Sequence, residues 1–353
     1  VAMSGGVDSS VAAALLKKQG YFVIGVFMKF WKGGKDGENR CCSVESEKLA
    51  RSVAKKIGVP FYVLNVEKEF KKKVVDYFLK EYKAGNTPNP CVVCNKEIKF
   101  GLLIEKALKL GADFVATGHY ARFCRETRNP KSEIRNYEYK LLKGRDKDKD
   151  QSYFLWQLNQ RQSKHILFPV GDYTKTQVRV LAKKFKLPTA ETPESQEVCF
   201  IQNTTNDFLK KYLKVKPGKI IDKLGKILGE HQGLWFYTIG QRKGLEIPQG
   251  PYYVVEKALK KNILVVSKDQ KDLLKKELVA ENVNWISGKE SKLPLKLKAK
   301  IRYRHNLADA AIIQHLTPNT YHIVFKKPQK AITPGQSAVF YKGMELLGGG
   351  VIE

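Results

Sequence analysis

One short loop near the start of the chain constrains its fold more than any other feature. An apolar stretch turns into a helix there through the residues Ser4, Gly5, Gly6, Val7, Asp8, Ser9 and Ser10. Glycines allow backbone N–H groups to approach an oxyanion closely, and a helix N-terminus adds a positive partial charge. Serine hydroxyls donate to phosphate oxygens, and a carboxylate such as Asp8 can help to hold Mg²⁺. This 4–10 loop therefore predicts a phosphate-binding strand–loop–helix unit, the plain alternative being an ordinary glycine turn.

The first half of the chain alternates short apolar runs with helical patterns. We expect strands over residues 22–27, 61–64 and 114–117, and helices over 9–16, 43–57, 69–82, 95–110 and 174–185. This alternation is typical of a doubly wound α/β fold, in which helices cover both faces of a parallel sheet. Ligands of such sheets bind at the carboxyl ends of the strands, where the 4–10 loop would lie.

Elsewhere in the chain, the residue pattern predicts a hairpin, then a lysine-rich stretch and then a series of strands. Runs at 120–123 and 137–142 predict a hairpin around an exposed, mobile polar loop at 125–136. The alternation fades near residue 204 into a lysine-rich stretch. After about residue 262 the apolar residues recur with period two, which predicts a small antiparallel β-barrel. For a chain of 353 residues we expect three domains: an α/β domain at 1–205, a small adaptor domain at 206–272 and a barrel at 273–353.

The charge of the chain indicates a nucleic-acid partner. Its 64 Lys and Arg residues against 35 Asp and Glu residues give a net charge of +29. A strongly basic balance matches the phosphate backbone of RNA or DNA, although the excess of Lys also fits a general lysine bias. No apolar run approaches the roughly 18 residues that a membrane span needs, and no signal peptide is evident. We therefore expect a cytoplasmic monomer without membrane contact.

Six cysteines are scattered along the chain, and one pair is informative. Cys91 and Cys94 form a CxxC motif that follows two prolines, which restrict the backbone. We expect Asn95 to cap the next helix and so to place Cys94 at a helix N-terminus, where a thiol pKa is lowered. A zinc half-site and two buried thiols are the alternatives. Cys199 would by itself be a core residue, and Cys41, Cys42 and Cys124 read as structural or incidental.

Several segments in order resemble one known family. The 4–10 loop is similar to the PP-loop of ATP pyrophosphatases, which split ATP into AMP and pyrophosphate while adenylating an oxygen. The ordered set resembles the tRNA-specific 2-thiouridylase (MnmA) family over nearly the whole chain. Its further segments are 26–29, 89–100, 117–120, 149–155, 195–200, 237–245, 302–304 and 333–336.

The resemblance implies ATP-dependent thiolation at C2 of the wobble uridine in tRNAs for Lys, Glu and Gln. Mg²⁺ would accompany ATP, and a cysteine desulfurase or sulfur-relay protein would deliver a persulfide to Cys199, which Cys94 attacks. The resemblance places ATP against Ala2, Met3, Ser4, Gly5, Gly6, Val7, Asp8, Ser9, Met28 and Gly118. It places tRNA against Asn89, Pro90, Cys91, His119, Lys149, Asp150, Gln151, Arg302, Tyr303 and Gln336.

One position departs from the family pattern. The best-known pattern has an aspartate, to which acid–base work is assigned, where this chain has Cys91. A thiol differs from a carboxylate in proton affinity, size and hydrogen bonding. Cys91, Cys94 and Cys199 together could instead hold a [4Fe–4S] cluster, as in related PP-loop tRNA thiolases. The sequence leaves the cluster and the persulfide route open.

Other functions fit parts of the pattern. A second PP-loop activity on tRNA, such as formation of lysidine or 2-thiocytidine, shares the loop, and lysidine formation needs no paired thiols. A non-catalytic, zinc-holding RNA-binding protein would not release pyrophosphate. A small-molecule amidating synthetase would turn over without RNA.

Overall fold

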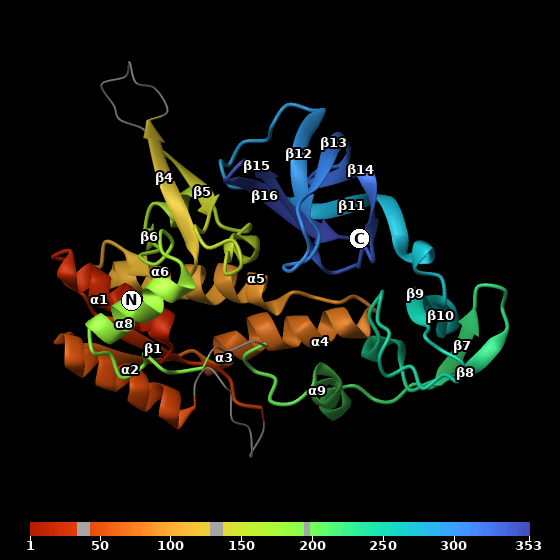
Figure 1. Ribbon diagram of the computed structural model, residues 1–353, viewed down its shortest axis with the longest axis horizontal. Coiled ribbons are helices and arrows are strands. Elements are labelled where there is room, and N and C mark those ends of the chain that lie inside the picture. The colour runs from red at the N-terminus through yellow and green to blue at the C-terminus, as the bar shows by residue number, and fades with distance from the viewer. Residues whose placement is uncertain (34–42, 128–136, 194–197) are drawn as a thin grey trace.

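The computed structural model describes residues 1–33, 43–127, 137–193 and 198–353. Three parts are visible in Figure 1: helices around a parallel sheet on the left, a barrel at upper right and a small sheet at lower right. The doubly wound α/β fold, the adaptor and the antiparallel barrel expected from the sequence are thereby confirmed. None of the helices in these ranges is long and apolar enough to cross a membrane.

A parallel sheet forms the centre of the N-terminal part. Ala2 forms a parallel bridge with Val26, and its N–H donates to the carbonyl of Ala116 at 2.8 Å. The first residues therefore lie between β1 and β3, which pair in turn with β2 and β6. The strands are β1 (Gly25–Lys29), β2 (Phe61–Asn65), β3 (Val115–Ala116) and β6 (Ile166–Leu167). The strand order reverses beside the first residues, which is where ligands of such sheets bind.

Helices of this part pack on the sheet and on each other. Helix α1 is buried on nearly every side, since Val11, Ala12 and Ala13 are all inaccessible to solvent. The helices are α1 (Val7–Lys18), α2 (Val44–Ile57), α3 (Glu67–Phe70), η1 (Lys71–Val75), α4 (Asp76–Lys83), α5 (Pro90–Cys94), η2 (Asn95–Leu102), α6 (Leu103–Lys109), η3 (Ser152–Phe154), α7 (Gln160–Ser163) and α8 (Lys175–Lys184).

Two predicted boundaries are wrong. The strand expected over 22–27 begins only at Gly25, and the Phe22 side chain is 83% exposed just after the turn at Gly20. The helix expected to start at Asn95 starts at Pro90, because Asn89 occupies the extended N-cap position. It continues without a break through η2 into α6, so Asn95 lies inside a helix.

The hairpin predicted in the first domain is present and joins the barrel. Strands β4 (Ala121–Thr127) and β5 (Tyr137–Lys143) pair antiparallel, and β5 also pairs with β16 (Glu345–Ile352). Most of the polar loop expected between them lies outside the described residues. The N-terminal and C-terminal parts thus share one continuous sheet.

The last two parts are built mainly from strands. The middle part contains α9 (Thr205–Tyr212), β7 (Gly218–Asp222), β8 (Ile227–His231), η4 (Leu234–Phe236), β9 (Tyr253–Ala258), η5 (Leu259–Lys261) and β10 (Ile263–Ser267). After η6 (Gln270–Leu273), the barrel uses β11 (Leu274–Trp285), β12 (Leu295–Lys300), β13 (Ala308–Thr317), β14 (Thr320–Lys330), β15 (Ser337–Lys342) and β16. Pairing of β11 with β16 closes it, and closure removes the exposed sheet edges.

Candidate nucleotide and thiol site

The 4–10 loop has the geometry of an anion-binding turn. Gly5 has φ +79, and a Cβ at that position would lie 2.5 Å from the carbonyl oxygen of Ser46. The Ser9 hydroxyl donates to the carbonyl of Gly6 at 3.0 Å and accepts from the N–H of Ser4 at 3.2 Å. No described side chain caps the N-terminus of α1, so the N–H groups of its first turn remain for a ligand.

Gly118 lies directly against this loop. A Cβ on Gly118 would come within 2.6 Å of the backbone nitrogen of Ser9. Met28 is buried on β1, two residues beyond the partner of Ala2, and so lies level with Ser4 in the parallel register. The structure therefore brings together the residues expected around ATP at the carboxyl edge of the sheet.

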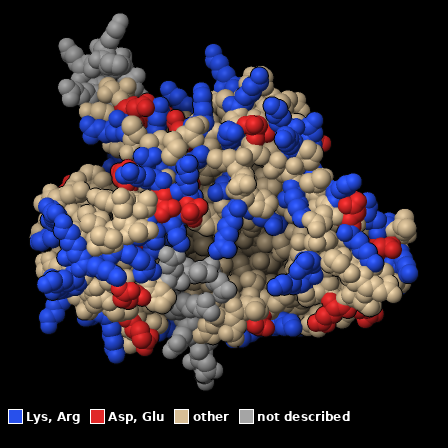
Figure 2. Space-filling view, in the orientation of Figure 1, with Lys and Arg blue, Asp and Glu red and all other residues tan. Residues whose placement is uncertain are grey.

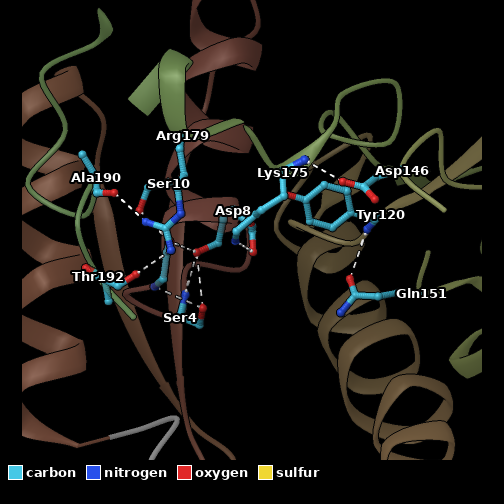
Figure 3. A network of polar contacts seen from close by, with 12 residues as sticks. Ser4, Asp8, Ser10, Tyr120, Asp146, Gln151, Lys175, Arg179, Ala190 and Thr192 are labelled. Atoms are coloured by element: carbon cyan, nitrogen blue, oxygen red, sulfur yellow. Dashed lines mark hydrogen bonds and ion pairs between the residues drawn. The ribbon is translucent and has the colours of Figure 1, made fainter. Parts of the chain in front are cut away.

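An ion pair that the sequence did not reveal lies at the start of α1. Lys175 Nζ is 2.7 and 2.8 Å from the two carboxylate oxygens of Asp8, and the Tyr120 hydroxyl donates to Asp8 Oδ1 at 2.7 Å. Figure 3 shows Lys175 beside Tyr120 and directed toward Asp8. Nothing in a lysine-rich sequence marks Lys175, because its role depends on how α8 packs on α1.

Arg179 lies one turn further along α8. Its guanidinium donates to the carbonyl of Ala190 at 2.8 Å and to that of Thr192 at 3.3 Å. Positions four apart share one face of a helix. The same face of α8 therefore holds the 4–10 loop through Lys175 and the 190–192 backbone through Arg179.

His119 connects the loop to the helix that begins with the CxxC motif. Its Nδ1 lies 2.7 Å from the Thr117 hydroxyl, and its ring centroid is 5.7 Å from that of Phe100 in η2. Burial lowers the pKa of His119 well below its ordinary value, and Lys99 lowers it further. The imidazole is therefore neutral near pH 7 and acts as a hydrogen-bonding group rather than a cation.

The CxxC motif occupies the first turns of its helix. Cys94 is buried and Cys91 is half-buried. The expectation that Asn95 caps the helix is wrong, so Cys94 does not stand at a helix N-terminus as expected. Instead, Asn95 donates through Nδ2 to the carbonyl of Phe154 at 3.1 Å, which ties this helix to the 149–155 segment.

The three predicted tRNA residues of the barrel contact three different segments of the other two parts. Gln336 donates to the carbonyl of Thr87 at 2.8 Å, and Arg302 donates to the carbonyl of Ile239 at 3.0 Å. The Tyr303 ring packs on Phe154 with a centroid separation of 4.5 Å. Gln336 therefore lies beside the loop that precedes Asn89, Arg302 contacts the middle part, and Tyr303 contacts the 149–155 segment.

The predicted tRNA residues at 149–151 lie beside Tyr120. Asp150 is buried, and its Oδ1 accepts from the N–H groups of Gly144 and Ser152 at 2.9 and 3.1 Å. Gln151 accepts from the N–H of Tyr120 at 3.1 Å, and Lys149 is half-buried. Asp150 therefore shapes the local backbone, while Gln151 lies next to the tyrosine that contacts Asp8.

Cys199 lies in a segment that packs on α3 and α4 through the next residue. It is half-buried, and the ring of the following Phe200 is 5.3 Å from Phe78 and 5.8 Å from Phe70. The helix between those two rings, η1, contacts α5. Both thiol segments therefore pack on the same helices. Ser195, Gln196, Glu197, Cys41 and Cys42 lie outside the described residues, and Cys124 is on β4.

Comparisons with known proteins agree with this architecture over the full chain. The family described as tRNA methyl transferase HUP domain matches residues 1–203, the tRNA methyl transferase PRC-barrel domain matches 206–268, and the aminomethyltransferase beta-barrel domain matches 275–352.

The tRNA-specific 2-thiouridylase MnmA 2 of Thermoanaerobacter sp. (strain X514) is 46% identical over 361 residues, covering 100% of this chain and 97% of that protein. The tRNA-specific 2-thiouridylase MnmA of Clostridioides difficile (strain 630) is 47% identical over 359 residues, covering 100% and 97%. The chain belongs to the tRNA-specific 2-thiouridylase (MnmA) family.

A metal site among the thiols can be assessed only in the described part of the chain. Within the described ranges, no three or more His, Cys, Asp or Glu side chains come together as a group that could hold a metal. A [4Fe–4S] cluster needs its cysteines to converge on one volume. The [4Fe–4S] cluster on Cys91, Cys94 and Cys199 and the zinc half-site at the CxxC pair both stay predictions.

The charge of the surface is complementary to tRNA, the substrate of this family. Figure 2 shows Lys and Arg side chains around a hollow in the middle of the face, between the N-terminal part and the barrel. A basic rim attracts phosphates, while a floor with less charge leaves room for bases.

Proposed function

We propose that this chain thiolates C2 of the wobble uridine in tRNAs for Lys, Glu and Gln. The observation that carries the proposal is the link from the nucleotide loop to the thiol helix. Gly118 lies against Ser9, and the next residue, His119, packs on Phe100 of the helix that begins with Cys91 and Cys94. An activated base and a sulfur nucleophile need this proximity.

The first step is activation of the uracil. The C2 oxygen attacks the α-phosphorus of ATP, pyrophosphate leaves, and the oxygen becomes an adenylate. The 4–10 loop and the first turn of α1 hold the phosphates through backbone N–H groups. Mg²⁺ neutralises phosphate charge when it is bound. Asp8 is a suitable oxygen ligand for it, but Lys175 contacts both of its carboxylate oxygens, so most ligands of the ion would come from ATP and water.

The second step transfers sulfur. A cysteine desulfurase or relay protein supplies a persulfide on Cys199. Its terminal sulfur attacks C2 and AMP leaves, while Cys94 attacks Cys199 Sγ and breaks the sulfur–sulfur bond. Alternatively, Cys94 attacks first and frees hydrosulfide, which then attacks C2. Either order leaves a Cys94–Cys199 disulfide, which a thiol reductant of a reducing compartment must reduce before the next turnover.

tRNA binding uses the residues that surround the thiol helix. We propose that Asn89, Pro90, Cys91 and His119 face the extruded uracil. Lys149, Gln151, Arg302, Tyr303 and Gln336 stand around them, with Asp150 shaping the backbone. An anticodon loop offers splayed bases, which suits aromatic and basic contacts.

The experiment compares ATP cleavage with sulfur transfer. Purified protein receives ATP, a persulfide donor and unmodified tRNA, and pyrophosphate and 2-thiouridine are measured separately. We expect pyrophosphate release to require tRNA, and Cys94→Ser and Cys199→Ser to abolish thiolation while pyrophosphate release continues. Cys124→Ser, on the β4 strand, is the matched control and should remain active.

Three results would contradict the proposal. Turnover without RNA would indicate a small-molecule synthetase, and bound zinc without pyrophosphate release would indicate an RNA-binding protein. Full activity of Cys94→Ser would indicate a tRNA modification that needs no thiol pair.

A further inference from the structure

The backbone that leads into the CxxC motif is held by both other domains. The N–H of Thr87 donates to the carbonyl of Pro334 in the barrel at 2.8 Å. The Thr87 hydroxyl lies 3.1 Å from the hydroxyl of Thr238 in the middle part. Gln336 donates through Nε2 to the carbonyl of Thr87 at 2.8 Å and to that of Pro88 at 3.4 Å. All three parts of the molecule therefore meet at Thr87.

The barrel turn at 333–336 fits this backbone closely. Gly335 has φ +86, and a Cβ there would lie 2.9 Å from the Thr87 nitrogen and 2.9 Å from Asn86 Cβ. Only glycine allows both that conformation and that approach. Glycine at position 335 therefore allows the 333–336 turn to pack directly on the backbone of Thr87.

Arg302 connects the 333–336 turn to the middle part of the chain. Arg302 uses one guanidinium nitrogen to donate to the carbonyl of Ile239 and to the hydroxyl of Thr333. Burial lowers the pKa of Arg302, yet an arginine stays charged at any pH the fold survives. The 333–336 turn therefore cannot shift without breaking charge-assisted hydrogen bonds.

We propose that Gln336 and Gly335 are positioning residues for the thiol helix. Asn89 is the N-cap of α5, and the prolines at 88 and 90 leave its approach little freedom. Fixing the backbone at 87–88 therefore fixes where Cys91 and Cys94 lie. The Gln336 amide is directed at the protein's own loop, so its role goes beyond the tRNA contact expected of it. The catalytic consequence rests on the proposed function of Cys94.

The test uses two variants with matched controls. Gln336→Ala removes the two contacts to the loop, and Gln329→Ala removes an exposed glutamine whose amide bonds only to neighbouring barrel carbonyls. Gly335→Ala adds a methyl against Thr87, while Gly343→Ala imposes similar strain (φ +60) where nothing lies within 4 Å. Each protein is measured for hydrogen exchange over 86–94, for alkylation of Cys94 relative to Cys124, for tRNA affinity and for thiolation rate.

We expect Gln336→Ala to speed exchange over 86–94 by about five- to tenfold, the usual effect of one lost hydrogen bond. Alkylation of Cys94 should rise, and the thiolation rate should fall even at saturating tRNA. Gly335→Ala should act in the same direction, and both controls should match the parent.

Unchanged exchange over 86–94 in Gln336→Ala would overturn the inference, as would weaker tRNA binding without a change in exchange. If Gly335→Ala does not fold, Gln336→Ala still decides the matter. Faster exchange and alkylation with undiminished thiolation would support the positioning role and contradict the proposed function of Cys94.

Discussion

Lys175 places its ammonium group within 2.8 Å of both carboxylate oxygens of Asp8, at the first turn of α1. Lys175 is only 9% exposed, so this is not a surface ion pair of small consequence. The pair holds the Lys175 ammonium group beside the place where the 4–10 loop would hold phosphates, with Asp8 as its counter-ion. Pyrophosphate gains charge as it leaves, and a preorganised cation there stabilises the transition state.

We therefore expect Lys175→Met to slow tRNA-dependent pyrophosphate release by about 10²-fold, the usual effect of removing one such donor. The methionine keeps most of the side-chain volume, so the fold should persist. Pyrophosphate release at saturating ATP is the measurement. Lys184→Met, on the exposed side of the same helix, is the control. A Lys175→Met enzyme with the parent rate would show that the pair is only structural.

The buried His119 predicts how stability depends on pH. Burial lowers its pKa well below the ordinary value, so the unfolded chain binds a proton more readily than the folded protein. The free energy of unfolding should therefore fall as the pH drops below about 6.5, the pKa of an unperturbed histidine. His119→Gln should remove this contribution.

Denaturant unfolding of parent and variant between pH 7.5 and about 5 gives the measurement. His231 and His305 also have lowered pKa values, because both are partly buried. The difference between parent and variant isolates His119. That difference should grow toward acid by at most about 1.4 kcal/mol per pH unit. A difference that is independent of pH would contradict the assignment.

The sequence predicted local structure well where one segment carries its own signals. The helix expected over 43–57 is α2, which spans Val44–Ile57 and ends at Gly58 with φ +68. The Asn95 cap was wrong because Asn89 and Pro90 start the helix five residues earlier. The local pattern did not distinguish these two possible starts. Contacts between distant segments left no local signal. The Asp8–Lys175 pair depends on α8 packing against α1, and the loop at Thr87 is held by residues more than 150 positions away.

The arrangement of the cysteines predicts activity without iron. Since no metal-holding group forms among the described residues, we expect protein purified anaerobically with a chelator to thiolate tRNA at the parent rate when a persulfide donor is present. Iron, sulfide and zinc analysis of the same sample is the measurement. Activity that appears only after iron and sulfide are restored, and that is lost in Cys91→Ala, would contradict the persulfide route.

Cys91 gives the sharpest test of how this chain departs from its family pattern. Its half-buried thiol stands in the first turn of α5, after Asn89 and Pro90, where the pattern has a carboxylate assigned to acid–base work. If the position serves proton transfer, Cys91→Asp should thiolate at least as fast as the parent. Cys91→Ala should then lose about 10²-fold, the lower end of general acid–base effects. Thiolation rates of the parent and of Cys91→Asp measured from pH 6 to 9 check this, because a thiol and a carboxylate ionise in different pH ranges. Equal activity of Cys91→Ala and the parent at every pH would show that this chain needs no acid–base group at position 91.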